Sequence, residues 1–176
     1  VSLLVLVSLV VTACKPTAET VDIGGAQFQI PDIQKDKFNI AMVLIGPHDD
    51  GGWSQAHYEG LVYVAENVPN THVAYIENVP EGADSEQVFR SLSRKGFDLI
   101  FGTSFGFGDA MEIVAGEFPD TMYIHLTGIK SNGTNFGNLM GAMENMKYLA
   151  GMLAGSRAKT DGNTKLGYIA TFPIPE

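Results

Sequence analysis

The sequence has few basic residues, one cysteine and no long apolar run, and each shortage excludes a class of protein. Lys and Arg number 11 against 20 Asp and Glu, a formal net charge of -9, which disfavours a nucleic acid as partner. Cys14 is the only cysteine, so the chain cannot form an internal disulfide. The apolar N-terminal run is shorter than the ~20 residues that a transmembrane helix needs. The overall composition, 45% hydrophobic and 18% charged, is typical of a globular α/β domain.

The chain also lacks the motifs that an enzyme would need. The Gly-rich stretch 102–109 has neither the GxGxxG spacing nor a following Walker lysine, and no GxSxG elbow frames Ser54 or Ser104. The stretch 48–50, His-Asp-Asp, has no second ligand cluster at a recognisable spacing, and Asp before Gly is ordinary turn chemistry. His125 ends an apolar strand and is interpreted as a structural histidine. We therefore expect no catalysis, no metal and no cofactor.

The N-terminal sequence VSLLVLVSLVVTACKP has the length of a signal-peptide hydrophobic region. A cleaved secretory signal is one interpretation. A bacterial lipobox, Val11 to Cys14, in which Cys14 carries the lipid, is favoured over it because Cys14 has no disulfide partner and directly follows small residues. The chain begins with Val and lacks a basic leader, which indicates a clipped start or a GTG start read literally. We predict a lipoprotein signal peptide over 1–14 and a flexible tether over 15–36.

From residue 37, apolar runs alternate with helical periodicity. The apolar runs predict strands at 38–45, 72–76, 97–101, 121–126 and 166–170. The periodicity and the cap signals predict helices at 53–68, 84–95, 109–118 and 144–158. The predicted buried side of the last helix holds Met146, Leu149, Ala150, Met152 and Leu153. Strands and helices alternate as in βαβ units, so we predict an α/β fold with a doubly wound, mostly parallel sheet.

Three loops of the predicted sheet lie where ligands of such sheets bind, beyond the carboxyl ends of the strands. They span 46–52, 77–83 and 102–108, and they hold more Gly, Asp and aromatic residues than a plain connection needs. Phe105 and Phe107 suit stacking on a flat ring better than cradling a phosphate, although we expect one of the pair to pack beneath its loop.

Asp50 in the first of these loops and Trp53 just after it are two further candidates. Asp50 can accept a hydrogen bond from a ligand, or it can cap the helix that follows. Trp53 opens that helix and, from its periodicity, is interpreted as a core residue.

The motifs, taken in order, resemble those of one protein family. The predicted lipobox is followed by AMVLIGPHDDGGWSQAHYEG (41–60), YIENVPEGAD (75–84), FDLIFGTSFGFGDA (97–110), EFPDTMYIHLTG (117–128), YLAGMLAG (148–155) and KLGYIATFPIPE (165–176). This series is similar to the basic membrane protein family, substrate-binding lipoproteins of ABC transporters that are related to bacterial purine nucleoside receptors. The resemblance implies a type I periplasmic-binding-protein fold, in which two α/β lobes joined by a hinge hold a purine between them.

The resemblance also implies a role for each candidate residue. Trp53 would stack on the purine, and Phe105 and Phe107 would line the pocket. Asp50 and Asp109 would contact the ligand or cap the helices that follow their loops. The Trp of the first loop, together with ENVPEG and FPIPE, is most similar to the binders of purine bases, so an adenine-like base is the expected ligand.

What the resemblance implies for the whole protein is capture of a ligand without chemistry. Residues 37–164 would form the N-terminal lobe and 165–176 the hinge and the start of a second lobe, most of which this fragment would not include. The implied partners are the purine, an ABC permease and the membrane, reached through the lipid anchor of a monomer on the extracytoplasmic face of the cell membrane, in the periplasm or at the cell surface. Three alternatives stay open: a purine nucleoside binder, a sensory lipoprotein without transport, and a nucleoside hydrolase-like enzyme that would need an Asp cluster with Ca²⁺.

Overall fold

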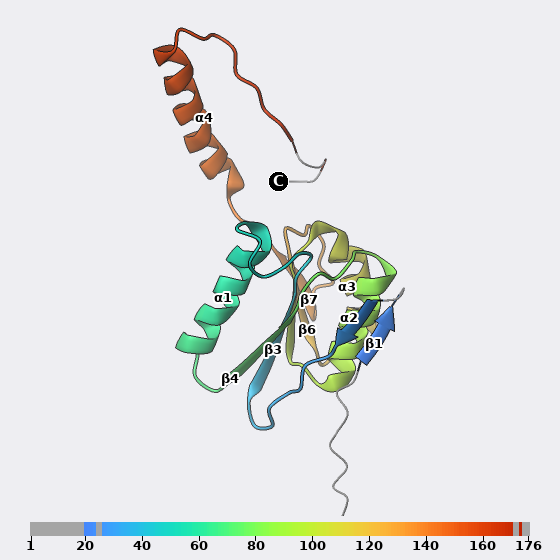
Figure 1. Ribbon diagram of the computed structural model, residues 1–176. Coiled ribbons are helices and arrows are strands. Elements are labelled where there is room, and N and C mark those ends of the chain that lie inside the picture. The colour runs from blue at the N-terminus through green and yellow to red at the C-terminus, as the bar shows by residue number, and fades with distance from the viewer. Residues whose placement is uncertain (1–19, 24–25, 171–172, 174–176) are drawn as a thin grey trace, which may run out of the picture.

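A computed structural model describes residues 20–23, 26–170 and 173, and it contains a fully parallel five-stranded sheet (Figure 1). The strands are β3 (Phe38–Val43), β4 (Thr71–Ile76), β5 (Leu99–Gly102), β6 (Met122–Leu126) and β7 (Phe136–Leu139), in the spatial order β4-β3-β5-β6-β7. The helices between them are α1 (Trp53–Asn67), α2 (Ala83–Lys95) and α3 (Gly108–Glu117), with a short 3₁₀ turn, η1 (Phe105–Phe107), before α3. The predicted doubly wound α/β fold is confirmed. Cys14 and the predicted signal peptide lie outside the described residues.

Helices cover both faces of the sheet because successive side chains of its strands point in opposite directions. On β3, Ile40 and Met42 face α1 and pack with Leu61. Ala41 and Val43 face the other way, into a larger cluster with α2 and α3. The helix side chains of that cluster include Val88, Phe89, Leu92, Met111 and Val114. The apolar runs of the sequence are therefore central strands buried on both sides.

The order of the strands defines the point at which a ligand is expected. From β3 the chain passes through α1 to β4 on one side, and from β4 it returns through α2 to β5 on the other side of β3. The loops that follow β3 and β5 therefore leave the sheet toward opposite faces. Doubly wound sheets bind their ligands in the crevice that this reversal opens beyond the carboxyl ends of the two strands.

The segment 20–36 was predicted to be part of a flexible tether, and the structure corrects this prediction. Strands β1 (Thr20–Ile23) and β2 (Ala26–Gln29) form an antiparallel hairpin, and β1 lies against α2 (Figure 1). Phe28 and Ile30 are buried in the core cluster. Ile33 also packs against this cluster. The segment resembles a tether in sequence because polar and Gly residues interrupt its apolar ones.

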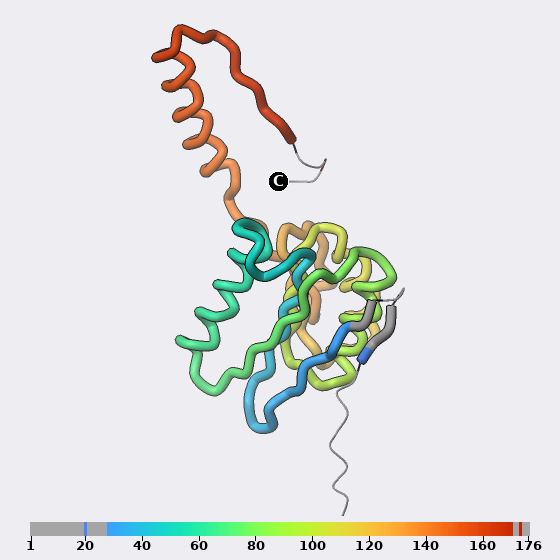
Figure 2. Tube along the Cα trace, viewed as in Figure 1, coloured from blue at the N-terminus to red at the C-terminus, as the bar shows by residue number. Residues whose placement is uncertain are grey.

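The C-terminal part of the described chain differs from the prediction in two ways. Helix α4 (Met143–Thr160) stands away from the sheet and buries none of its residues (Figure 2). Its predicted buried side, which includes Met146, Leu149 and Met152, is exposed. Residues 166–170 are not a strand, and the fifth strand of the sheet is instead β7, from a Gly/Asn-rich stretch. Helical periodicity shows that a helix has an apolar side, but it does not show what covers that side.

None of the helices in the described part of the chain combines the length and the apolarity that crossing a bilayer requires.

Candidate functional site

The loop after β3 turns sharply into α1, and Asp50 fixes that turn. Its carboxylate accepts hydrogen bonds from the backbone N–H groups of Gly52 (2.8 Å), Ser54 (3.0 Å) and Gln55 (3.0 Å). These bonds, the one from Gln55 first, lower the pKa of Asp50. Both carboxylate oxygens are thus engaged with the first turn of the helix. The structure favours the capping role of Asp50 over direct contact with a ligand.

Trp53 opens α1 and places its indole at the reversal of the sheet. The indole Nε1–H donates to the backbone carbonyl of Thr103 over 2.6 Å, which joins the first ligand-edge loop to the third. The side chain of His57 packs against the indole with ring centroids 4.5 Å apart, and its ring N–H donates to the Trp53 carbonyl over 2.7 Å. Trp53 nevertheless stays 39% exposed, so the interpretation from periodicity as a core residue is wrong.

Side chains from three directions hold the loop between β5 and α3, residues 103–107. Trp53 binds the carbonyl of Thr103, and His125 at the end of β6 donates from Nε2 to the carbonyl of Ser104 over 2.7 Å. Glu81, from the loop after β4, accepts from the Ser104 hydroxyl (2.5 Å) and from the Gly106 N–H (3.0 Å). A Cβ on Gly106 would lie 2.1 Å from the Glu81 carboxyl carbon, so this contact needs a glycine. These contacts fix the conformation of the loop.

The two phenylalanines of this loop take different positions. Phe107 is fully buried and meets Phe89 of α2 edge to face, with ring centroids 5.5 Å apart. It packs beneath the loop, as expected for one of the pair, and it does not line the exposed edge. Phe105 is 36% exposed and lies 6.3 Å from the ring of His125. Of the pair, only Phe105 is exposed at this edge.

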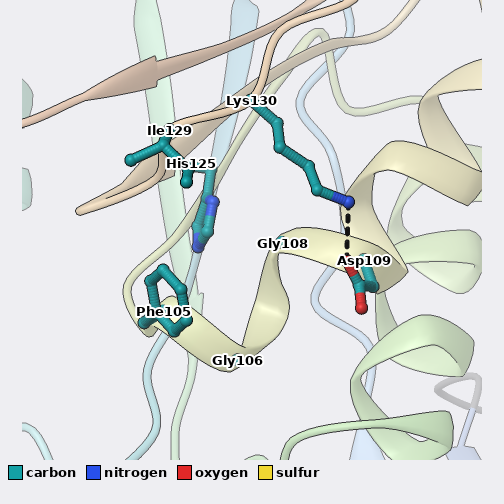
Figure 3. Close-up of a pocket in the computed structure, with 7 residues that line it drawn as sticks. All are labelled: Phe105, Gly106, Gly108, Asp109, His125, Ile129 and Lys130. Carbon is teal, nitrogen blue, oxygen red and sulfur yellow. Dashed lines mark hydrogen bonds and ion pairs between the residues drawn. The ribbon is translucent and has the colours of Figure 1, made fainter. Parts of the chain in front are cut away.

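A cavity of about 140 Å³ opens beside Phe105, on the β6 side of the loop (Figure 3). Its lining consists of Phe105, Gly106, Gly108, Asp109, His125, Ile129 and Lys130. At its rim the Lys130 ammonium lies 2.8 Å from Asp109 and 2.7 Å from Glu112. The hydrogen bond from Lys130 lowers the pKa of Asp109 and raises that of Lys130. Asp109 therefore lines the cavity as an exposed, paired carboxylate.

His48, which sequence reasoning rejected as a metal ligand, has a partner in the protein. Its ring nitrogen and its backbone N–H both contact the Glu77 carboxylate, at 2.7 Å and 2.8 Å, and the backbone bond is the main cause that lowers the pKa of Glu77. The imidazole also packs against Tyr58 and Tyr75. Within the described residues there is no group of three His, Cys, Asp or Glu side chains arranged to hold a metal ion.

Sequence reasoning missed Glu81 at this edge, and it interpreted His125 as a structural histidine without naming its partner, the carbonyl of Ser104. Glu81 lies in the second ligand-edge loop, within the turn Pro80 to Gly82, and His125 is the fourth residue of β6. A search for every polar residue in the loops that follow predicted buried strands would have found Glu81. The contacts of Glu81 and His125 with the loop 103–107 join residues 21 to 25 positions apart, which no local pattern reveals.

The sequence matches a known family over most of its length. Residues 37–176 match Bmp, described as "ABC transporter substrate-binding protein PnrA-like". The chain belongs to the Bmp family. The predicted family is thereby confirmed, and the residues that form the edge described above all lie within the matched range.

Two curated relatives of this Bmp-family chain differ in their named ligands. A protein of Haloferax volcanii, provisionally named as a glucose-binding protein of an ABC transporter, is 39% identical over 158 residues, which are 90% of this chain and 38% of that protein. A purine-binding protein of Brucella abortus is 34% identical over 143 residues, which are 81% of this chain and 40% of that protein. The chain thus spans about two fifths of the length of these relatives.

Solved structures of two solute-binding proteins of ABC transporter systems share the fold. The one from Aeropyrum pernix has a TM-score of 0.61 at 21% identity, over 72% of this chain and 35% of that one. The one from Conexibacter woesei has a TM-score of 0.57 at 22% identity, over 67% of this chain and 40% of that one. At these identities the likeness concerns the fold alone, and it agrees with the parallel sheet covered on both faces.

Proposed function

We propose that this Bmp-family chain carries half of the ligand site of a substrate-binding protein, which captures a purine and delivers it to an ABC permease. The observation that carries the proposal is the placement of Trp53. Its indole lies at the reversal of the sheet, with its only polar atom bonded to Thr103 and its ring partly exposed. A planar ligand can stack on such a ring without disturbing a hydrogen bond of the protein.

An adenine-like base fits this edge better than the other candidates. Its ring needs an aromatic plate and a few acceptors or donors at its rim, and the edge offers Trp53 and Phe105 as exposed aromatics with His125 nearby. Stacking of a base on an aromatic side chain contributes about 1–3 kcal/mol in alanine substitutions. The name of the Brucella abortus relative points to the same ligand class.

A hexose is a second candidate, because the Haloferax volcanii relative is named for glucose. A sugar ring can also rest on an indole, but its hydroxyl groups need many hydrogen-bond partners. Of the three aspartates of the edge, Asp50 is engaged with the backbone of α1 and Asp109 with Lys130, so only Asp49 among them is left to accept from a sugar hydroxyl. This favours a purine over a hexose. A purine nucleoside, which adds a sugar to the base, fits the edge less well than a purine base and better than a hexose.

The cellular setting of the proposal follows from the family and from the N-terminal sequence. We place the protein on the extracytoplasmic face of the membrane, held as a monomer by a lipid on Cys14. Its role is binding without catalysis. Transport and sensing would be separated by the neighbouring genes, since a permease and an ATPase gene alongside favour transport, whereas a kinase or a regulator gene favours sensing.

Fluorescence titration tests the proposal, because Trp53 is the only tryptophan of these 176 residues. In the intact protein, adenine should quench or shift the emission. The affinity obtained from the titration should be higher for adenine than for guanine, the purine nucleosides or glucose. By calorimetry, Trp53→Ala should weaken adenine binding by about tenfold to a hundredfold, from the loss of stacking. Tyr63→Ala is the matched control, since Tyr63 is an aromatic residue of the same helix and is 64% exposed. His57→Ala is no neutral control because His57 contacts the indole.

The possible outcomes separate the candidates. Binding of glucose alone would replace the purine with a hexose, and tighter binding of adenosine than of adenine would make the protein a nucleoside binder. The proposal fails if none of the purines or their nucleosides changes the emission or releases heat.

A further inference from the structure

The loop after β4 carries an acidic residue, Glu81, whose backbone position is fixed on both sides. Val79, two residues earlier, is fully buried and donates from its N–H to the Leu44 carbonyl over 3.1 Å. Gly82, the next residue, has a φ of 87°, in the left-handed region that favours glycine, and the chain turns there into α2. Between these two fixed points the side chain of Glu81 is exposed at the ligand edge of the sheet.

The two carboxylate oxygens of Glu81 are used unequally. Oε1 accepts two hydrogen bonds, one from the Ser104 hydroxyl and one from the Gly106 N–H. Oε2 accepts none from the described residues. Both oxygens lie over Gly106, where a Cβ would be 2.3 Å from each, so the carboxylate is held against the backbone of the loop. A carboxylate oxygen accepts about two hydrogen bonds, so Oε1 is saturated and Oε2 is a fixed acceptor that is still free.

Glu81 and Trp53 hold consecutive residues of the same loop. The indole Nε1–H donates to the carbonyl of Thr103, and the Glu81 carboxylate accepts from Ser104, the next residue. Trp53 opens the helix on one face of the sheet, whereas Glu81 lies in the loop that leads to α2 on the other face. The aromatic plate and the free acceptor therefore stand on opposite sides of the reversal of the sheet, where a ligand is expected.

A free carboxylate oxygen at a ligand site needs a donor once the ligand has covered it. Solvent supplies that donor at an open edge, but a bound ligand displaces the solvent, and an ionised oxygen left without a partner costs free energy. An N–H of the ligand can replace the solvent, whereas a ring nitrogen or a carbonyl oxygen of the ligand would be repelled. Because Oε1 is already taken, the carboxylate suits a single N–H better than paired donors that would bridge both oxygens.

We propose that Glu81 determines specificity, its Oε2 atom accepting an N–H of the ligand that stacks on Trp53. The inference rests on the proposed binding of a purine, and adenine has donors of this kind in its exocyclic amine and its ring N–H. Glu81 holds the loop with one oxygen and reads the ligand with the other. The site therefore selects planar ligands that present an N–H at the edge of the ring.

The substitution Glu81→Gln separates recognition of the ligand from support of the loop. Its amide oxygen takes the place of Oε1, because the Gly106 N–H requires an acceptor, and its NH₂ group then stands where Oε2 was. The loop keeps its contacts while the free acceptor becomes a donor, whereas Glu81→Ala removes both. Asp84→Asn is the matched control: it removes one negative charge in the first turn of α2, and the hydrogen bonds described for the loop 103–107 do not involve Asp84.

Adenine, 9-methyladenine and unsubstituted purine are the probes, because the second lacks the N9–H donor and the third lacks the exocyclic amine. Calorimetry on the intact protein measures the three affinities for the native sequence and for each variant. In the native protein, loss of the donor that Oε2 accepts should weaken binding by about tenfold to a hundredfold. In Glu81→Gln the affinity for adenine should fall to about that of the probe without this donor. In Asp84→Asn the native difference between the probes should remain.

The emission of Trp53 without ligand reports whether the loop is intact, because the indole is bonded to Thr103. It should be native in Glu81→Gln and altered in Glu81→Ala. The inference is overturned if Glu81→Gln keeps the native discrimination, if the native protein binds all three probes equally, or if the emission of Glu81→Gln changes as it does in Glu81→Ala. In the last case the carboxylate acts only by holding the loop. Adenine binding to the native protein leaves the proposed function standing in all three cases, whereas absence of binding of all three probes to the native protein overturns both.

Discussion

Asp50 lies in the loop before α1, three residues before Trp53, which opens the helix. Asp50 accepts three backbone N–H groups of the first turn of α1, the turn on which Trp53 stands. The start of the helix sets the position of the indole, and the bond to Thr103 sets its orientation. Asp50 is thus a positioning residue, whose effect on a ligand passes through Trp53.

Asp50→Asn should lower stability at neutral pH and reduce the loss of stability in acid. The backbone bonds hold the pKa of Asp50 in the folded state below its ordinary value of 3.8. A group with a lowered folded pKa stabilises the protein above the unfolded value, and this contribution is lost as the pH falls through the folded pKa. An asparagine side chain does not titrate, so the variant lacks that part of the loss. Urea unfolding midpoints from pH 7 down to about pH 2.5 measure the effect.

Asp49→Asn is the matched control, because Asp49 is exposed and accepts no hydrogen bond from the described residues. Glu77, whose pKa is also lowered, keeps some acid dependence in every variant. Equal acid losses for the native protein and Asp50→Asn would show that the bonds to Gly52, Ser54 and Gln55 do not form in solution.

At the residue scale, the sequence predicted which residues lie at the ligand edge. It did not predict which side chains bind to them. The loop positions of Trp53 and Phe105 followed from the end of each apolar run, and the packing of one phenylalanine beneath the loop was foreseen. The contacts of Glu81 and His125 with the loop 103–107 could not be predicted because they depend on how the ends of β4, β5 and β6 meet in space. The burial of the His125 ring depends on two glycines whose backbones approach it, at 108 and 128.

Among the elements, the hairpin of β1 and β2 lies in a segment that apolar side chains attach to the domain. Its side chains Phe28 and Ile30 join the cluster formed by α2, α3 and one face of the sheet. The larger strands were predictable because each is a continuous apolar run. The hairpin and β7 were not, since FGNL of β7 and AQFQ of β2 each hold at most two large apolar residues.

Ile30→Ala tests whether the hairpin segment is part of the domain. Ile30 is 1% exposed, so its truncation should leave a cavity in the core and lower the free energy of unfolding by about 2–5 kcal/mol. Ile113→Ala on α3 makes the same chemical change at a side chain that is 51% exposed, and its effect should be within about 0.5 kcal/mol of zero. Urea unfolding followed by circular dichroism measures both. Equal, small effects of the two substitutions would mean that the segment is a flexible tether, as the sequence predicted.

For the whole molecule, the sheet and α4 behave as separate parts. Leu139 ends the last strand, and α4 begins at Met143 with its apolar side chains exposed (Figures 1 and 2). The alternation of strands and helices predicted the doubly wound sheet, because each βα unit can be recognised locally. It also placed α4 in the first lobe, with the boundary at residue 164. The structure instead ends the packed lobe at β7, and we expect the crossing toward a second lobe to lie at 140–142.

Hydrogen exchange followed by mass spectrometry tests this boundary in the 176-residue chain. Helix α2 buries six residues, whereas α4 buries none. An isolated helix of 18 residues is only marginally stable in water, so peptides from α4 should exchange far faster than those from α2. Proteases should also cut first at 140–142, leaving a resistant fragment that ends there. Exchange from α4 as slow as that from α2 would mean that its apolar side, including Met146, Leu149 and Leu153, is covered. A resistant fragment extending past Thr160 would then show that α4 packs against the rest of the domain.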